Sequence, residues 1–317
     1  MTRQVTFYHS FFRLIASFTL ISLLAACSVA PVLAPVTNLP GELQSQPLAG
    51  KNRALVALVL GSGAARGFAH VGVLKVLEAN GIQADIVVGS SSGAVVGALY
   101  AGGIRGHELV EAAAELDMGN LTDWIFPNRG VVRGERLQQY LNQRLQNRPI
   151  EALPIKYVAV ATDLVSGTLM AFNHGDTGMA VRASSAIPGL VQPVLIDGRE
   201  YVDGGVVSQV PVHVARKLGA DVIIAIDVSR HPLPADQLSS TLAVMQQAII
   251  VMSNQIAEAE LAYADIVIRP NVGAFGIDDF DLRDQVLAAG EAAALEALTE
   301  IKRLINEKTA QKRAHPE

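Results

Sequence analysis

The sequence predicts an α/β fold in which a doubly wound, mostly parallel sheet is flanked by helices. Apolar runs of strand length alternate with amphipathic stretches of helix length along most of the chain. The first run, 54–60, is continuously apolar, as is typical of a strand covered on both faces of a parallel sheet. This strand and the next each lead through a glycine-rich turn into a helix. Ligands of such sheets bind at the carboxyl ends of the strands, so the two turns are where we expect the functional site.

The composition indicates a globular protein and excludes some classes of function. Half of the 317 residues are apolar and 17% are charged, so the chain can bury a large core. The net charge of -5 and the pI near 5.8 argue against a nucleic-acid-binding protein, whose surface would be basic.

The N-terminus has the pattern of a bacterial lipoprotein signal. Arg3 and Arg13 precede an apolar run, 14–26, that is too short for a membrane span. The run ends in Leu24-Ala25-Ala26-Cys27, which resembles a lipobox. Cys27 is the only cysteine and cannot form an internal disulfide, so we expect it to carry lipid. The alternative is an ordinary secretory signal with a coincidental cysteine.

Four segments are therefore expected. They are a signal peptide over 1–26, a lipidated cysteine with a proline-rich tether over 27–52, one folded domain over 53–310 and a tail over 311–317. Lipidation would place the protein in the bacterial cell envelope. Ser28 follows the cysteine in place of the aspartate that is associated with inner-membrane retention, so we expect an outer-membrane anchor facing the periplasm.

The first glycine turn, 61–67, lies between the strand at 54–60 and a helix at 68–80. It is not a Walker A loop, because no lysine followed by serine or threonine comes after Gly67. It also departs from the dinucleotide fingerprint, which needs glycine where Arg66 stands. Successive backbone amides at a helix start can instead hold a negative oxygen, and an oxyanion hole is the use that we expect.

The second turn has the G-x-S-x-G spacing of a nucleophile elbow. Gly89 and Gly93 stand two residues on either side of Ser91, between a strand at 85–88 and a helix at 92–101. The sharp turn needs small residues there because backbone comes close on both sides, and it holds the serine strained with its oxygen exposed. The alternative is a serine-rich loop whose hydroxyls cap the helix.

The remaining elements continue the alternation. We expect helices at 107–116, 134–145, 211–219, 242–263 and 284–307, and strands at 156–162, 221–228 and 265–270. The helix at 242–263 contains the apolar run 248–252, which is too short for membrane insertion and predicts a buried core helix. The apolar face of the last helix is predicted to be Leu287, Leu295, Leu298, Ile301 and Ile305.

One acidic turn lies between these elements. Asp203 is followed by Gly204 and Gly205, which is either a tight turn or a site where small glycines let another chain segment approach the carboxylate. Upstream of it lies the block 183–190, Ala-Ser-Ser-Ala-Ile-Pro-Gly-Leu.

Together, the glycine turn, the elbow, this block and the D-G-G turn resemble the patatin-like phospholipase family over roughly 55–271. That resemblance implies a Ser-Asp dyad, with Ser91 as nucleophile and Asp203 as its base. The amides of Gly61, Ser62, Gly63 and Ala64 would hold the oxyanion, and Arg66 would brace their loop. Ser62 stands where many members have glycine, which leaves the backbone amides in place.

The implied activity is hydrolysis of fatty-acyl esters of phospholipids or other lipids through an acyl-serine intermediate, with membrane lipid as substrate partner and neither cofactor nor metal. Two alternatives stay open. One is an α/β-hydrolase esterase with a triad of Ser91, Asp203 and either His213 or His231. The other is a non-catalytic envelope lipoprotein that uses the fold to bind lipid or a partner.

Overall fold

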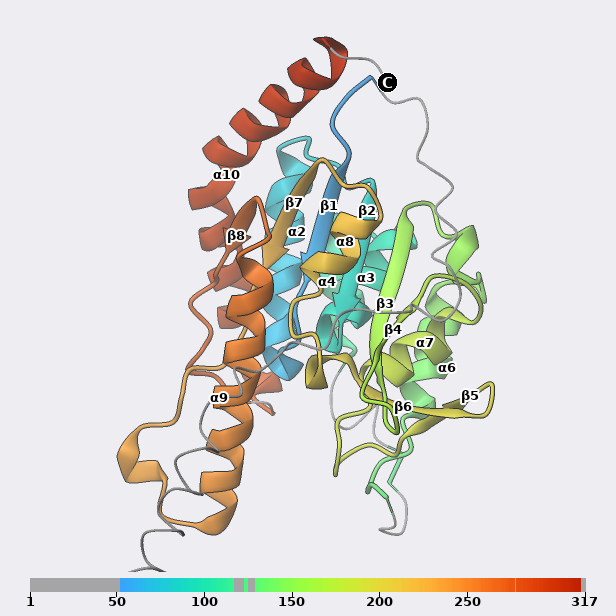
Figure 1. The fold of residues 1–317 in the computed structure, drawn as a ribbon, viewed down its shortest axis with the longest axis vertical. Helices are drawn as coiled ribbons and strands as arrows, with labels where there is room; N and C mark the ends of the chain where they lie inside the picture. Colours follow the sequence, from blue (N-terminus) through green and yellow to red (C-terminus); the bar gives the residue numbers. More distant parts are fainter. Residues whose placement is uncertain (1–51, 117–122, 125–128, 277, 315–317) are drawn as a thin grey trace, which may run out of the picture. The chain divides into compact units, whose positions relative to one another are not determined.

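The computed structural model describes residues 52–116, 123–124, 129–276 and 278–314. The predicted signal peptide, Cys27 and nearly all of the tether lie outside these residues. Within them, one mixed sheet forms the centre of the fold, and the predicted mostly parallel α/β architecture is confirmed (Figure 1).

The sheet has a parallel part and an antiparallel part. The parallel strands, in order across the sheet, are β3 (Lys156–Asp163), β2 (Ile86–Ser90), β1 (Val56–Leu60), β7 (Val222–Ile226) and β8 (Ile266–Ile268). The antiparallel strands are β4 (Leu169–Phe172), which pairs with β3; β6 (Arg199–Asp203), which pairs with the last residues of β3; and β5 (Val194–Ile196), which pairs with β6. Strand β4 was not predicted, because a four-residue strand leaves almost no periodic signal in the sequence.

Helices cover both faces of the sheet. They are α2 (Phe68–Ala79), α3 (Ser92–Ala101), α4 (Gly106–Ala114), α6 (Glu135–Arg144), α7 (Thr177–Ser184), α8 (Val212–Lys217), α9 (Thr241–Leu261) and α10 (Arg283–Ala314). Alternate residues of β1 point to opposite sides. Leu58 and Leu60 pack in the cluster that contains α2, α3 and α10, whereas Ala57 and Val59 pack in the cluster that contains α8 and the end of α9.

Two expectations about helix faces are wrong. Leu295 does not belong to the packing face of α10, since it is 58% exposed while Val286, Gly290 and Ala294 are buried. Gly290 lies in that face because a Cβ there would overlap the carbonyl oxygen of Ala69 in α2.

The predicted burial of helix α9 is also wrong. Its apolar run was predicted to be buried, but only Ile250 of that run is. The first half of α9 extends beyond the end of the sheet (Figure 1). In the described part of the chain, no helix is both long and apolar enough to cross a membrane.

Candidate active site

The register of the sheet brings the two predicted catalytic residues together. In the register, Leu60 pairs with Gly89, Ser90 with Val160, and Ala161 with Asp203. Ser91, at the end of β2, therefore lies beside the end of β6. Its Oγ donates a hydrogen bond of 2.6 Å to Oδ2 of Asp203, 112 positions away in the sequence.

The elbow has the strained geometry that its glycines allow. Ser91 has φ 54° and ψ -123°, a region that a non-glycine residue rarely occupies. A Cβ at Gly89 would overlap the carbonyl oxygen of Gly93, and a Cβ at Gly93 would overlap that of Leu60. Neither glycine is needed for its own φ, so both are required by lack of space.

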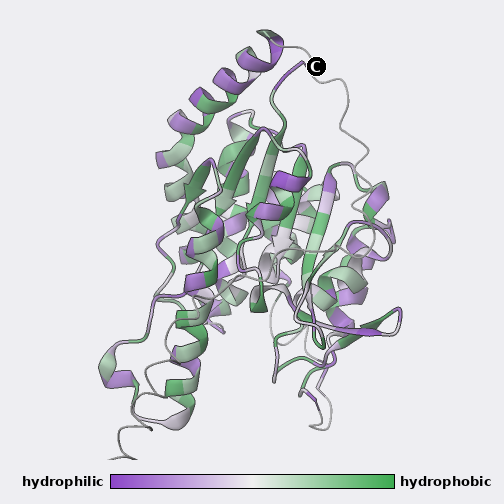
Figure 2. Ribbon diagram, in the orientation of Figure 1, coloured by the Kyte–Doolittle hydropathy of each residue, from purple (hydrophilic) through white to green (hydrophobic). Residues whose placement is uncertain are grey.

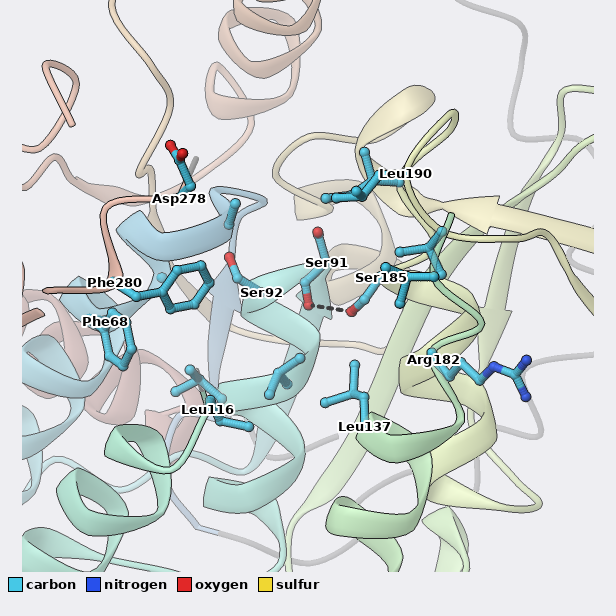
Figure 3. A pocket seen from close by; sticks show the side chains of 18 of the residues that line it. Phe68, Ser91, Ser92, Leu116, Leu137, Arg182, Ser185, Leu190, Asp278 and Phe280 are labelled. Carbon is cyan, nitrogen blue, oxygen red and sulfur yellow. Dashed lines mark hydrogen bonds between the residues drawn. The ribbon is translucent and has the colours of Figure 1, made fainter. Parts of the chain in front are cut away.

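Two hydroxyls from the block 183–190 hold this turn. Ser184 Oγ accepts a hydrogen bond of 3.0 Å from the Ser91 amide and donates one of 2.5 Å to the Val160 carbonyl. Ser185 Oγ donates to the Ser91 carbonyl at 3.3 Å (Figure 3). No role was predicted for these two serines, because no local pattern shows which distant backbone a hydroxyl will reach.

Asp203 is fixed by its backbone and its second oxygen. Its Oδ1 accepts a 2.8 Å hydrogen bond from the Gly205 amide, and its carbonyl accepts one of 2.8 Å from Thr162 Oγ1. The side chain is buried, and burial raises the pKa of Asp203 to about 6, although the hydrogen bonds from Ser91 and Gly205 act in the opposite direction. Such a carboxylate is ionised at neutral pH and is a stronger base than an exposed aspartate.

The D-G-G turn is crowded by other segments, as expected from its small residues. A Cβ at Gly204 would overlap the Val160 carbonyl oxygen and lie 2.5 Å from Ser90 Oγ. At Gly205 a Cβ would lie 2.7 Å from Ser62 Oγ and 2.8 Å from Gln209 Oε1, which are side-chain ends that can move.

The first glycine turn requires a correction. The Gly61 amide already donates to the Ile226 carbonyl at 3.1 Å, and the Ser62 amide donates to the Gln209 carbonyl at 2.9 Å. These two amides are therefore not available to an oxyanion, contrary to the prediction. Gly63 and Ala64 stand at the start of the short helix η1 (Ala64–Gly67), where a helical backbone leaves its first amides without an internal acceptor.

Ala64 in this turn also has a strained backbone. It has φ 50°, so it is the second non-glycine residue of the site with a left-handed backbone, and it lines the pocket beside Ser91. Arg66 braces the loop as expected, since it donates to the carbonyls of Val228 at 2.8 Å and Phe275 at 3.1 Å.

His70, which was not predicted as a site residue, supports the same loop through the Gly61 carbonyl. Its Nε2 is 2.9 Å from the Gly61 carbonyl oxygen, and burial lowers the pKa of His70 to about 4. The imidazole is therefore neutral, and Nε2 carries the proton that it donates to that carbonyl. A lone histidine in an apolar helix gives no sequence signal of this role.

The histidines of the triad alternative lie elsewhere. His213 packs against Tyr263, with the two ring centroids 4.4 Å apart. His231 is exposed, and its amide donates a hydrogen bond to the Gly273 carbonyl. Among the residues that the structure describes, the side-chain partner of Ser91 Oγ is Asp203, and no histidine is hydrogen-bonded to either.

A pocket of about 210 Å³ opens beside Ser91. Figure 3 shows Leu190, Leu116, Leu137, Phe68 and Phe280 around it, and the guanidinium of Arg182 pointing away from its centre. That guanidinium is bonded to the Arg133 carbonyl and to Gln138. A cavity with mainly apolar walls and a nucleophile-like serine hydroxyl at its edge fits a hydrocarbon chain joined to an ester.

Comparisons with known proteins agree with the fold and the motifs. The sequence model of the family described as patatin-like phospholipase matches residues 58–216, about half of the chain. An uncharacterized NTE family protein of Mycobacterium tuberculosis is 38% identical over 183 residues, which are 57% of this chain and 51% of that protein. The chain thus spans about half the length of that curated relative.

Two further similarities extend over more of this chain. The patatin-like phospholipase domain-containing protein 6 of Mus musculus is 30% identical over 268 residues, which are 74% of this chain and 20% of that protein. The crystal structure of VipD from Legionella pneumophila superimposes with a TM-score of 0.56 at 14% identity, covering 78% of this chain and 67% of VipD. The similarity to VipD shows the fold.

The crowding of the D-G-G turn predicts different tolerances of its two glycines. Gly204→Ala places a methyl group against a backbone carbonyl, whereas Gly205→Ala meets only side-chain ends. We expect Gly204→Ala to lower the free energy of unfolding by at least about 1 kcal/mol more than Gly205→Ala does. Urea denaturation of the two variants measures this difference, and equal or reversed costs would contradict the packing described.

Proposed function

The chain belongs to the patatin-like phospholipase family, and from this premise we propose that it is a serine acyl hydrolase that cleaves fatty-acyl esters of lipids with Ser91 and Asp203. The observation that supports this most directly is the 2.6 Å hydrogen bond to a buried carboxylate from Ser91 Oγ, whose residue lines an apolar pocket. A lysophospholipase of Coccidioides immitis, 29% identical over 86% of this chain and 19% of its own length, supports the same substrate class.

The proposed reaction has two half-reactions. Asp203 Oδ2 takes the proton of Ser91 Oγ as that oxygen attacks the ester carbonyl carbon, and the amides of Gly63 and Ala64 hold the resulting oxyanion. Collapse of this intermediate breaks the bond to the alcohol, which leaves with the proton from Asp203. Water then attacks the acyl-serine while Asp203 takes its proton, and the fatty acid leaves as that proton returns to Ser91.

The identity of the nucleophile can be tested by covalent labelling. A fluorophosphonate probe should modify Ser91 alone, because among its serine neighbours only Ser91 Oγ is bonded to a carboxylate. Peptide mapping of the labelled protein identifies the site, and Ser91→Ala is the control. Labelling of Ser90 or Ser92 in the presence of Ser91 would refute the assignment.

The role of Asp203 can be tested by the pH dependence of kcat/KM. The base must be ionised, so turnover of a soluble ester should be constant above the folded-state pKa of about 6 and fall about tenfold per pH unit below it. Asp203→Asn keeps the shape and removes the charge, so it should lower turnover by about 10²- to 10⁴-fold above pH 6 and should lack the acidic limb of the wild type.

A Ser-Asp-His triad would give a different result in the same assay, because one histidine would be essential. His213→Ala and His231→Ala should keep the activity and the pH limb of the wild type, since both side chains contact other groups or solvent. Loss of turnover in either variant with folding intact would favour a Ser-Asp-His mechanism.

We also propose that Cys27 is lipidated and anchors the domain to the outer membrane, facing the periplasm, with membrane lipid as the substrate partner. Support comes from the lipobox-like sequence before Cys27 and from Ser28 after it. Metabolic labelling with a palmitate analogue should mark the wild type and fail on Cys27→Ala. Membrane fractionation of the labelled cells then tests the location, and recovery of the labelled protein in the inner membrane would contradict it.

A further inference from the structure

The first half of helix α9 presents an apolar surface to solvent. Six large apolar side chains lie there with 44% or more of their surface exposed, against a background in which most large apolar residues of the described chain are buried. The six, which we call the α9 face, are Leu242, Val244, Met245, Ile249, Val251 and Met252. Contiguous exposed apolar surface of this kind marks a site of interaction.

Several polar residues in the same part of the helix are partly covered by the protein. Gln246, Gln247, Ser253 and Asn254 are half-buried. The Gln247 side chain accepts a 2.7 Å hydrogen bond from the Leu233 amide, and Asn254 donates one of 3.0 Å to the Arg230 carbonyl. The inner side of this half-helix thus combines Ile250 with hydrogen-bonded polar side chains, whereas large apolar side chains occupy the outer side, where a surface helix is usually polar.

The position of α9 follows from the two strands that it connects. It connects β7 to the parallel strand β8, so it runs against the strands and begins at their carboxyl ends, where the Ser91 pocket lies. Its 21 residues rise about 31 Å, whereas a five-residue strand spans roughly 16 Å. The helix therefore extends past the sheet at the active-site end, and Figure 2 shows hydrophobic segments along this free half.

We propose that the α9 face docks on the surface of a lipid bilayer and holds the Ser91 pocket toward it. The choice of lipid over a protein partner rests on the proposed function and on two features of the face. No charged residue occurs between Asp236 and Glu258, so the face lacks the flanking charges that specify pairing in helical dimers. On a helix of 100° per residue the six side chains also spread over about 180°, which is wider than the seam that one partner helix covers.

A probe attached to the face tests the contact directly. In the full chain with Cys27→Ala, a single new cysteine at Ile249→Cys or at Leu295→Cys is labelled with an environment-sensitive fluorophore. The two positions are matched, because both side chains are helical and 58% exposed. Vesicles of phosphatidylcholine and phosphatidylethanolamine should raise and blue-shift the emission at position 249 and leave position 295 unchanged.

The response should also survive high salt. The face is uncharged, so about 1 M salt, which reduces the screening length to about 3 Å, should not abolish the signal. Equal responses at both positions, or loss of the signal in salt, would overturn the proposal. A high signal without vesicles would overturn it too, and would indicate a second copy if it rises with protein concentration or another segment of this chain if it does not.

Turnover separates this inference from the proposed function. In the same background, the triple change Met245→Gln, Ile249→Gln and Met252→Gln should lower hydrolysis of vesicle phospholipid roughly tenfold or more. The reason is that three apolar side chains no longer insert into the bilayer. Hydrolysis of a soluble short-chain ester should be unchanged, and Leu295→Gln should change neither. Equal vesicle activity in the triple variant would overturn docking while the hydrolase proposal stands. Absence of turnover in the unsubstituted background would refute the hydrolase while the probe still reports docking.

Discussion

The site depends on how closely its backbone segments approach one another. A Cβ at Gly93 would overlap the Leu60 carbonyl, one at Gly89 would overlap the Gly93 carbonyl, and one at Gly204 would overlap the Val160 carbonyl. The first contact packs the elbow against β1, the second closes the elbow on itself, and the third packs the D-G-G turn against β3, so the glycines allow the turns that carry Ser91 and Asp203 to approach closely. The 2.6 Å hydrogen bond between the two side chains is possible because no side chain separates their turns.

The same crowding determines the chemistry of the carboxylate. Water is excluded from Asp203, so its pKa rises from 3.8 to about 6 and the folded state holds the proton more strongly than the unfolded chain. Stability is therefore highest at acid pH, as far as this group is concerned, and falls as pH rises through about 6. The ionised form costs about 3 kcal/mol of stability at neutral pH. The burial that makes Asp203 a stronger base thus lowers the stability of the folded state at neutral pH, a trade-off that is common at functional sites.

Local sequence patterns predicted the parts of the molecule that local forces determine. Helix α3 begins at Ser92 and ends at Ala101 as expected, because the elbow and the following glycines bound it on both sides. The pattern could not show that the Gly61 and Ser62 amides are bonded to β7 and the 208–210 loop, since those acceptors are far away in the sequence. The bounds of helix α9 were predicted well, but the burial of its apolar run was not. An apolar run predicts burial, whereas the length of the helix relative to the sheet decides which half is covered.

The covered half of α9 shows why its exposed half is held in a fixed direction. Glu260 is buried, accepts hydrogen bonds from Ser208 Oγ and from the Val210 amide, and has its pKa raised by burial to about 8. Gln209, between those two residues, accepts from the Ser62 amide and donates to the Ser62 carbonyl. Because α9 and the loop of the first glycine turn are thereby joined through one short segment, the orientation of the α9 face relative to Ser91 is set by buried hydrogen bonds. A bilayer that contacts the face would therefore meet a pocket whose first glycine turn is joined to the same helix through buried hydrogen bonds.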